Sequence, residues 1–167
     1  METTSAPTKV YDAPWGAALR WTSFALVALT ALMFLGLAWV RGAMGQSIAA
    51  WLLPLMVVGT VPFMIRSYAI TGDELLIRRL LWTTRLPLTG LKSAELMPRV
   101  MSTSLRTFGN GGGFSFTGWF WNKPLGHYRA FVTDLNRTVV LRFEKRTVVV
   151  SPAEPEDFVR QLAPQPS

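Results

Sequence analysis

The sequence predicts an α+β membrane protein, in which an N-terminal two-helix transmembrane hairpin precedes an antiparallel β-barrel with a C-terminal capping helix. Three observations support this fold class. Two long uncharged hydrophobic runs come first, short strand-like runs separated by turn residues fill the second half, and an amphipathic segment ends the chain. Half of all residues are hydrophobic and only 16% are charged, as expected for a chain partly embedded in lipid.

The first uncharged run extends from Trp21 to Val40 and reads WTSFALVALTALMFLGLAWV. At about 1.5 Å per residue, such a helix covers the ~30 Å hydrocarbon core of a bilayer. A helix in a soluble core would keep a polar stripe, which this run lacks. We therefore expect residues 1–20 to form a cytoplasmic tail and residues 21–40 to form the first transmembrane helix. A cleaved signal peptide would have a shorter hydrophobic stretch.

The second uncharged run, SIAAWLLPLMVVGTVPFMI, ends at Arg66. We expect a second transmembrane helix over residues 47–66 and a short extracytoplasmic loop over residues 41–46. A connection of this length makes the two helices antiparallel neighbours.

The charges that flank the two runs predict the orientation of the hairpin. The connecting loop carries Arg41 alone. Many more basic residues lie near the other ends of the helices, namely Lys9, Arg20, Arg66, Arg78, Arg79 and Arg85. By the positive-inside rule, both termini face the cytoplasm. We expect a multi-pass membrane protein.

Two prolines, Pro54 and Pro62, interrupt the second run. The interpretation we favour is a kinked packing helix, because neighbouring helices can satisfy the freed carbonyls. The alternative is a break along an ion or substrate pathway, in which oligomerised hairpins form a transporter or channel. No charged residue lies inside either run, so the usual sign of an intramembrane relay is missing.

Beyond Arg66 the pattern changes to short runs rich in Val, Leu, Ile, Phe and Trp, divided by turn residues. We expect hairpins to join these strands. In the run TVVLRF, alternate residues are apolar, so one face of that strand is expected to face the core and the other to face water. The predicted strands are Tyr68–Thr71, Glu74–Trp82, Arg85–Leu88, Phe114–Trp121, His127–Thr133, Thr138–Phe143 and Arg146–Ser151.

The final segment, SPAEPEDFVRQL, predicts a short helix. Pro155 suits the first helical position, and Glu156 and Asp157 complement the positive end of the helix dipole. Phe158 and Leu162 lie on one apolar face, which suits a helix that covers the open end of a barrel.

The order of these elements, with the phrases YAITGDELLIRR, LPLTGL, RTFGNGGGFSFTGWFWNKPLGHYRAFVTDLNRTVVLRF and TVVVSPAEPEDFVRQL, resembles the bacterial PH-like domains of small membrane proteins of unassigned function. The resemblance implies a bent antiparallel barrel capped at one end by the last helix. With the resemblance, we expect a protein of the bacterial cytoplasmic (inner) membrane with a cytoplasmic PH-like domain at residues 67–163. From the residues themselves, we expect a disordered tail at residues 164–167. Eukaryotic PH domains that bind phosphoinositides use a basic first hairpin, whereas the corresponding turn here is Gly72-Asp73-Glu74.

A glycine-rich segment contains Gly109, Gly111, Gly112 and Gly113. Bare backbone amides can approach a phosphate, but the segment lacks the Gly-Lys-Ser/Thr ending of a P-loop. We expect a flexible hairpin connection, or a loop that docks the backbone of a partner.

Two groups are candidate contacts with the membrane surface or a partner. Arg78, Arg79 and Arg85 follow the second span closely, where they either hold lipid phosphates or an acidic partner, or are solvated determinants of orientation. The second group is an aromatic cluster with a following lysine. Its members either dip into the bilayer interface or pack alternately inside the barrel and over its rim; they include Trp119, Trp121 and Lys123.

We expect no catalytic residue, cofactor or metal. The chain has no cysteine and a single histidine, His127, which cannot form an ordinary zinc site. The basic residues are dispersed among acidic ones, which argues against nucleic acid. The predicted function is a non-catalytic interaction or scaffold module anchored in the lipid bilayer. Its PH-like domain is expected to bind a protein partner, a second copy of the chain, or the membrane surface with its anionic headgroups.

Overall fold

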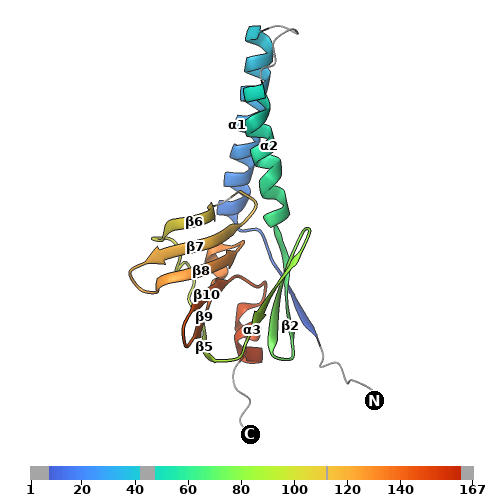
Figure 1. The fold of residues 1–167 in the computed structure, drawn as a ribbon. Helices are drawn as coiled ribbons and strands as arrows, with labels where there is room; N and C mark the ends of the chain where they lie inside the picture. The colour runs from blue at the N-terminus through green and yellow to red at the C-terminus, as the bar shows by residue number, and fades with distance from the viewer. Residues whose placement is uncertain (1–7, 42–47, 112, 163–167) are drawn as a thin grey trace.

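The computed structural model describes residues 8–41, 48–111 and 113–162 (Figure 1). Two helices, α1 (Ala17–Arg41) and α2 (Ile48–Thr60), rise side by side from a β domain. The rings of Phe34 and Trp51 meet between them at a centroid separation of 5.3 Å. Apart from Arg41, the expected connecting loop lies outside the described residues.

Helix α1 begins at Ala17, before the expected start at Trp21. Its first turns pack on the β domain, where Leu19 and Ser23 are buried, so the start of the helix is held by protein contacts. Within the described residues, α1 is the helix that is long and apolar enough to cross a membrane.

Helix α2 is shorter than expected and ends at Thr60, where a 3-10 turn, η2 (Val61–Phe63), follows. Pro62 explains this ending, because proline has no amide hydrogen for an α-helical bond and disfavours α conformation at the preceding residue. The chain is already extended at Met64, before the expected end at Arg66.

The first sheet has four antiparallel strands in the order β1-β2-β3-β4. Strand β1 was not predicted, because it lies in the segment that we expected to be a cytoplasmic N-terminal tail. It pairs with β2 from Lys9 opposite Ile70 to Asp12 opposite Ser67. Both helices are therefore inserted between two neighbouring strands. The strands are β1 (Lys9–Asp12), β2 (Ile65–Thr71), β3 (Glu74–Arg79) and β4 (Thr83–Pro87).

The second sheet has six strands in the order β5-β9-β10-β8-β7-β6. In Figure 1 these strands follow one another down the helix axis, with β6 nearest the helices and β5 farthest from them. Its strands are β5 (Leu91–Leu96), β6 (Leu105–Gly111), β7 (Phe116–Asn122), β8 (Gly126–Val132), β9 (Val139–Phe143) and β10 (Thr147–Val150).

One expectation about the connections was wrong. Strands β8 and β9 do not form a hairpin, because a 3-10 turn, η3 (Leu135–Arg137), separates them and β10 inserts between them, parallel to β8. The strands form two sheets, and the pairings among the described residues do not show the closure of the expected barrel. Strands β5 and β6 were not predicted.

The hydrophobic core lies on both faces of the six-stranded sheet. On β9, Val139 and Leu141 face the first sheet and the last helix, while Val140 faces a second cluster with Tyr128. The expectation that this face meets water is therefore wrong at Val140, which packs in the cluster with Met101, whereas the Arg142 side chain on the same face is 40% exposed.

The expected C-terminal helix is present as α3 (Pro155–Leu162), with Phe158 fully buried. The ring of Tyr11 on β1 packs edge-on against Phe158 at 5.1 Å, and its hydroxyl donates to Asp157 Oδ2 at 2.8 Å. Lys9 also donates to this carboxylate. The hydrogen bonds from Lys9 and Tyr11 lower the pKa of Asp157. Strand β1 thus contacts both the first strand of the domain after the helices, β2, and its last helix, α3.

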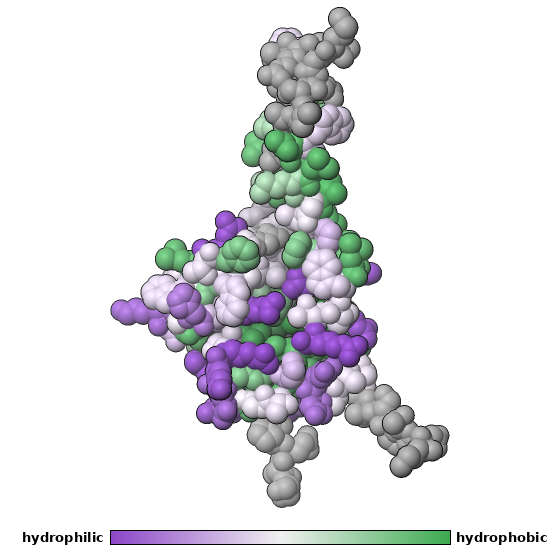
Figure 2. Space-filling model, in the orientation of Figure 1, coloured by the Kyte–Doolittle hydropathy of each residue, from purple (hydrophilic) through white to green (hydrophobic). Residues whose placement is uncertain are grey.

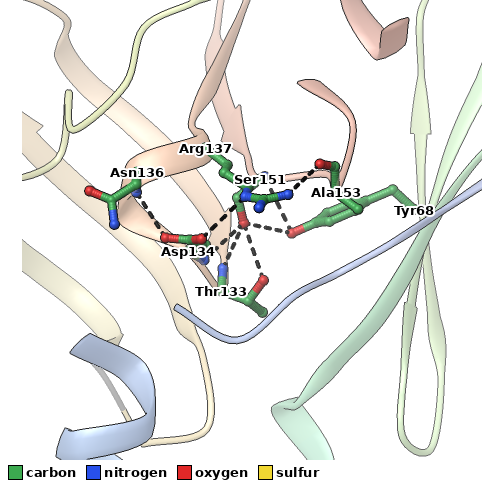
Figure 3. Close-up of polar contacts among 7 residues, drawn as sticks. All are labelled: Tyr68, Thr133, Asp134, Asn136, Arg137, Ser151 and Ala153. Carbon is green, nitrogen blue, oxygen red and sulfur yellow. Dashed lines mark hydrogen bonds and ion pairs between the residues drawn. The ribbon is translucent and has the colours of Figure 1, made fainter. Parts of the chain in front are cut away.

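A buried polar network holds the segment before α1 (Figure 3). The Ser151 hydroxyl accepts hydrogen bonds from the backbone amides of Thr133 at 2.8 Å and Asp134 at 3.2 Å. The Tyr68 hydroxyl donates to Phe131 O at 2.7 Å, and burial raises the pKa of Tyr68 to about 12, so it remains a donor.

Gly16 connects this network to the helices. Its amide donates to Thr133 O at 3.0 Å, and a Cβ at this position would lie 2.6 Å from Asp134 Oδ1. Only glycine fits here, so the chain enters α1 from a position that the domain determines.

Replacement of Ser151 by Ala would leave two buried amides without an acceptor. We expect the free energy of unfolding to fall by about 3 kcal/mol, since each unsatisfied buried group costs about 1–3 kcal/mol. The control is Ser93→Ala, because the Ser93 hydroxyl bonds, among the described residues, only to exposed Glu95 and its loss is expected to cost under about 0.5 kcal/mol. Chemical denaturation in detergent measures both, and equal losses would contradict the role given to Ser151.

Candidate functional site

A cavity of about 550 Å³ opens where the second helix meets the β domain. The end of α2 and η2 form one wall, the β3–β4 hairpin forms another, and strands β6, β7 and β8 form the rest. Its lining residues are Met56, Thr60, Phe63, Arg79, Trp82, Thr84, Arg106, Phe108, Gly109, Thr117, Gly118, Trp119 and Arg129. We call this cavity the arginine pocket.

Arg79 is the buried cation of the arginine pocket, with 7% of its surface exposed. Alternation along β3 puts it on the same face as the buried residues Leu75 and Ile77. Three rings surround its guanidinium, with Cζ at 5.8 Å from Phe63, 5.4 Å from Trp82 and 5.2 Å from Phe131.

The Arg79 guanidinium has no anionic partner among the described residues. Its Nε is buried without a hydrogen-bond partner there. Burial lowers the pKa of Arg79, and repulsion from Arg129 lowers it further. Even so, an arginine stays protonated, so the charge remains in the pocket.

Arg129 on β8 is the second cation of the arginine pocket. Its Cζ lies 4.9 Å from the ring of Phe131, so this one ring is shared with Arg79. Arg106 on β6 supplies a third guanidinium, which packs against Gly111. None of the lining residues is acidic. The arrangement can therefore attract and hold an anion.

An apolar turn, Leu80–Trp82, stands beside the arginine pocket. The Arg79 amide donates to Trp82 O at 2.9 Å, and the Leu80 amide donates to Met64 O at 3.1 Å, so the turn is tied to the end of η2. The expected strand through Trp82 is thus wrong in its last residues, because the chain reverses after Arg79. Leu81 is 71% exposed.

The same end of the domain carries further exposed apolar side chains. Phe108 on β6 is 76% exposed, and Trp119, its partner across the β6–β7 pairing, is about half exposed. In Figure 2 the green hydrophobic surface covers much of the helices, whereas purple residues are concentrated on the domain. We call Leu80, Leu81, Trp82, Phe108 and Trp119 the apolar rim.

Two hydrogen bonds fasten the helices to the turn between β6 and β7. The Phe114 amide donates to the Ser23 hydroxyl of α1 at 3.0 Å, and the Ser115 hydroxyl donates to Phe63 O of η2 at 3.1 Å. Because both helices are held, the arginine pocket and the apolar rim keep a defined position relative to them.

The glycine-rich segment has a structural role that the sequence did not indicate. Gly109 and Gly111 belong to β6, and Gly113 lies in the turn that follows, while Gly112 is outside the described residues. Gly109 pairs with Gly118, and a Cβ on Gly118 would collide with Phe108 O. The pair therefore lets the two strands approach closely beside the arginine pocket.

The structure separates the arginines that the sequence grouped. Of Arg78, Arg79 and Arg85, only Arg79 lines the arginine pocket. Arg78 is exposed on the other face of β3, beside a cavity that Asp12 also lines, and Arg85 lies 3.9 Å from Glu74 at the far end of the β3–β4 hairpin.

The side chains of the aromatic cluster alternate between the two faces of β7. Phe120 is buried, whereas Trp119 and Trp121 are on the outer face of β7. Lys123 is exposed in the turn between β7 and β8. Arg106 and Arg129 were not predicted as site residues, because only the strand order brings them to Arg79.

A second cavity of about 490 Å³ lies between the turn at Gly72 and the last helix. It contains Asp73 and a single cation, Lys92. The hairpin that binds phosphoinositides in eukaryotic PH domains therefore corresponds here to a region without a cluster of basic side chains.

A family model described as a bacterial PH domain matches residues 66–165. No curated protein and no solved structure matches the chain.

Replacement of Gly118 by Ala tests the close approach of β6 and β7. Gly118 has φ +141°, and the added methyl would meet the Phe108 carbonyl, so we expect a loss of about 3 kcal/mol in stability. Gly126→Ala is the control: its φ of +67° is also positive, but no atom lies within 4 Å, so the loss should be about 1 kcal/mol. Denaturation followed by tryptophan fluorescence compares them, and equal losses would argue against a steric role for Gly118.

Proposed function

The chain belongs to the bacterial PH domain family, and from this premise we propose that it is a membrane-anchored, non-catalytic interaction module whose PH domain lies on the bilayer surface and binds it. The observation that carries this proposal is the position of the apolar rim. It lies beside the end of α2 and η2, where Trp82, Phe108 and Trp119 line the same cavity as Met56 and Phe63, so a bilayer crossed by the helices would meet it directly.

The exposed surface of the helices supports a location in lipid. On α1, Phe24, Leu29, Leu32 and Leu35 all expose more than half of their surface. Burial of apolar surface is worth roughly 25 cal/mol per Å², so lipid is a far more favourable environment than water for this surface. Together, α2 and η2 extend ~25 Å, close to the hydrocarbon thickness.

The direct attachment of the domain supports surface contact. No linker separates α2 from the domain, because β2 begins at Ile65, two residues after η2 ends at Phe63. With the hydrogen bonds to Ser23 and Phe63, this connection holds the apolar rim at the level where the helices leave the domain. Tryptophan and leucine side chains in such a position suit the bilayer interface.

The basic residues near the domain support a cytoplasmic location. Arg20 at the start of α1 and Arg66 on β2 are exposed on the domain side of the helices, and the other cations of the domain share that side. By the positive-inside rule, the PH domain and both termini face the cytoplasm of a bacterial cell.

Membrane contact by the domain can be measured with single cysteines, because the chain has none of its own. We expect an environment-sensitive fluorophore on Leu81→Cys, in nanodiscs, to emit at shorter wavelength and to be quenched by lipids spin-labelled near the headgroup. The matched control is Lys145→Cys, in the exposed turn between β9 and β10, which should behave as in water.

Equal quenching at the two positions would contradict surface contact. The Lys145→Cys variant also tests sidedness in bacterial cells: a membrane-impermeant maleimide should label it only after permeabilisation. Labelling of intact cells would contradict the cytoplasmic location.

A further inference from the structure

The buried guanidinium of Arg79 requires an anion that the described residues do not supply. A buried charge is normally paired, because desolvation without a partner is unfavourable. The three aromatic rings around Arg79 offset part of this penalty through cation–π contact. They provide no acceptor for its N–H groups, and Nε remains unsatisfied within the described part of the chain.

A second guanidinium lies beside the first. Arg79 and Arg129 approach the same ring of Phe131, so two like charges are held together although they repel each other. The Arg129 side chain makes no hydrogen bond or ion pair with another described residue, and its guanidinium lies over the ring of Phe131. Two guanidinium groups without an anionic partner in the described part of the chain therefore lie at one cavity. Their N–H donors suit the oxygens of a phosphate group, which guanidinium groups bind in bidentate fashion.

The form of the arginine pocket agrees with a ligand of modest size. Its volume of about 550 Å³ is within the usual range for small-molecule sites, roughly 300–1,000 Å³. Arg106 and the hydroxyl of Thr84 add polar groups to the wall, while Met56 of α2 gives the helix side an apolar character. The pocket thus joins a cationic interior to an apolar side next to the helices.

We propose that the arginine pocket binds a phosphate ester, with Arg79 and Arg129 holding the phosphate oxygens. An anionic phospholipid headgroup and a soluble phosphate ester share this chemistry. The lipid source rests on the proposed membrane-surface function, because it requires the helix side of the pocket to adjoin the bilayer. The site differs from the first hairpin used by eukaryotic PH domains, since here that turn carries Asp73 and Glu74 at the other end of β3.

The test uses the full chain in a mild detergent and native mass spectrometry. The probes are phosphatidylglycerol, diacylglycerol with the same acyl chains, and glycerol 1-phosphate. The variants are Arg79→Gln and Arg129→Gln, with Arg85→Gln as the control for loss of a positive charge, because Arg85 is exposed near Glu74 and outside the pocket.

We expect each pocket variant to bind phosphatidylglycerol at least about tenfold more weakly, because each loses the charge-assisted hydrogen bonds of one guanidinium group. Arg85→Gln should change the affinity less than about twofold. Diacylglycerol should not bind in the pocket. Arg129 is exposed, so Arg129→Gln keeps the test valid if Arg79→Gln fails to fold.

The probes distinguish the two sources. Binding of phosphatidylglycerol without glycerol 1-phosphate would support the site with a lipid headgroup as ligand, and comparable binding of both would support it with a soluble ester. Equal phosphatidylglycerol affinity in all the proteins, or diacylglycerol binding as tight as phosphatidylglycerol binding, would overturn the proposal. Neither result depends on the Leu81 fluorophore, so failure of the pocket and failure of membrane contact can be told apart.

Discussion

The pairing of β1 with β2 is the constraint on which the arrangement of this protein depends. These two antiparallel strands are neighbours in the sheet, yet both helices lie between them in the sequence. The chain therefore leaves the domain and returns to it at adjacent positions. A helical pair attached by one end could pivot, whereas here the register of Lys9 opposite Ile70 ties both ends to one sheet.

The rest of the domain reinforces this attachment. Asp157 of α3 accepts hydrogen bonds from two side chains of β1, and the Ser151 network positions the backbone that receives Gly16. On the other side, Ser23 and Phe63 bond to the turn after β6. The arginine pocket forms between these attachments, so its shape depends on the helices as well as on the strands. The proposed membrane anchor and the proposed ligand site are therefore structurally coupled.

Local patterns predicted the elements whose signals lie close together in sequence. The hydrophobic run of α1 and the Pro155 start of α3 are examples, and the family resemblance was confirmed over residues 66–165. Strand β1 was missed because its partner β2 lies beyond both helices. The burial of Arg79 could not be predicted from the sequence of β3 alone, because the aromatic rings around its guanidinium come from three separate segments of the chain.

Amide hydrogen exchange of the full chain in nanodiscs tests the central claim, that β1 is an integral strand of the PH domain. If β1 is such a strand, peptides covering residues 8–13 exchange about a hundredfold more slowly than the same peptides in denaturant, as expected for strands of a stable sheet. Exchange of these peptides at the unstructured rate, with β2 still protected, would show that the chain before α1 is free and that β1 does not hold the helices to the sheet.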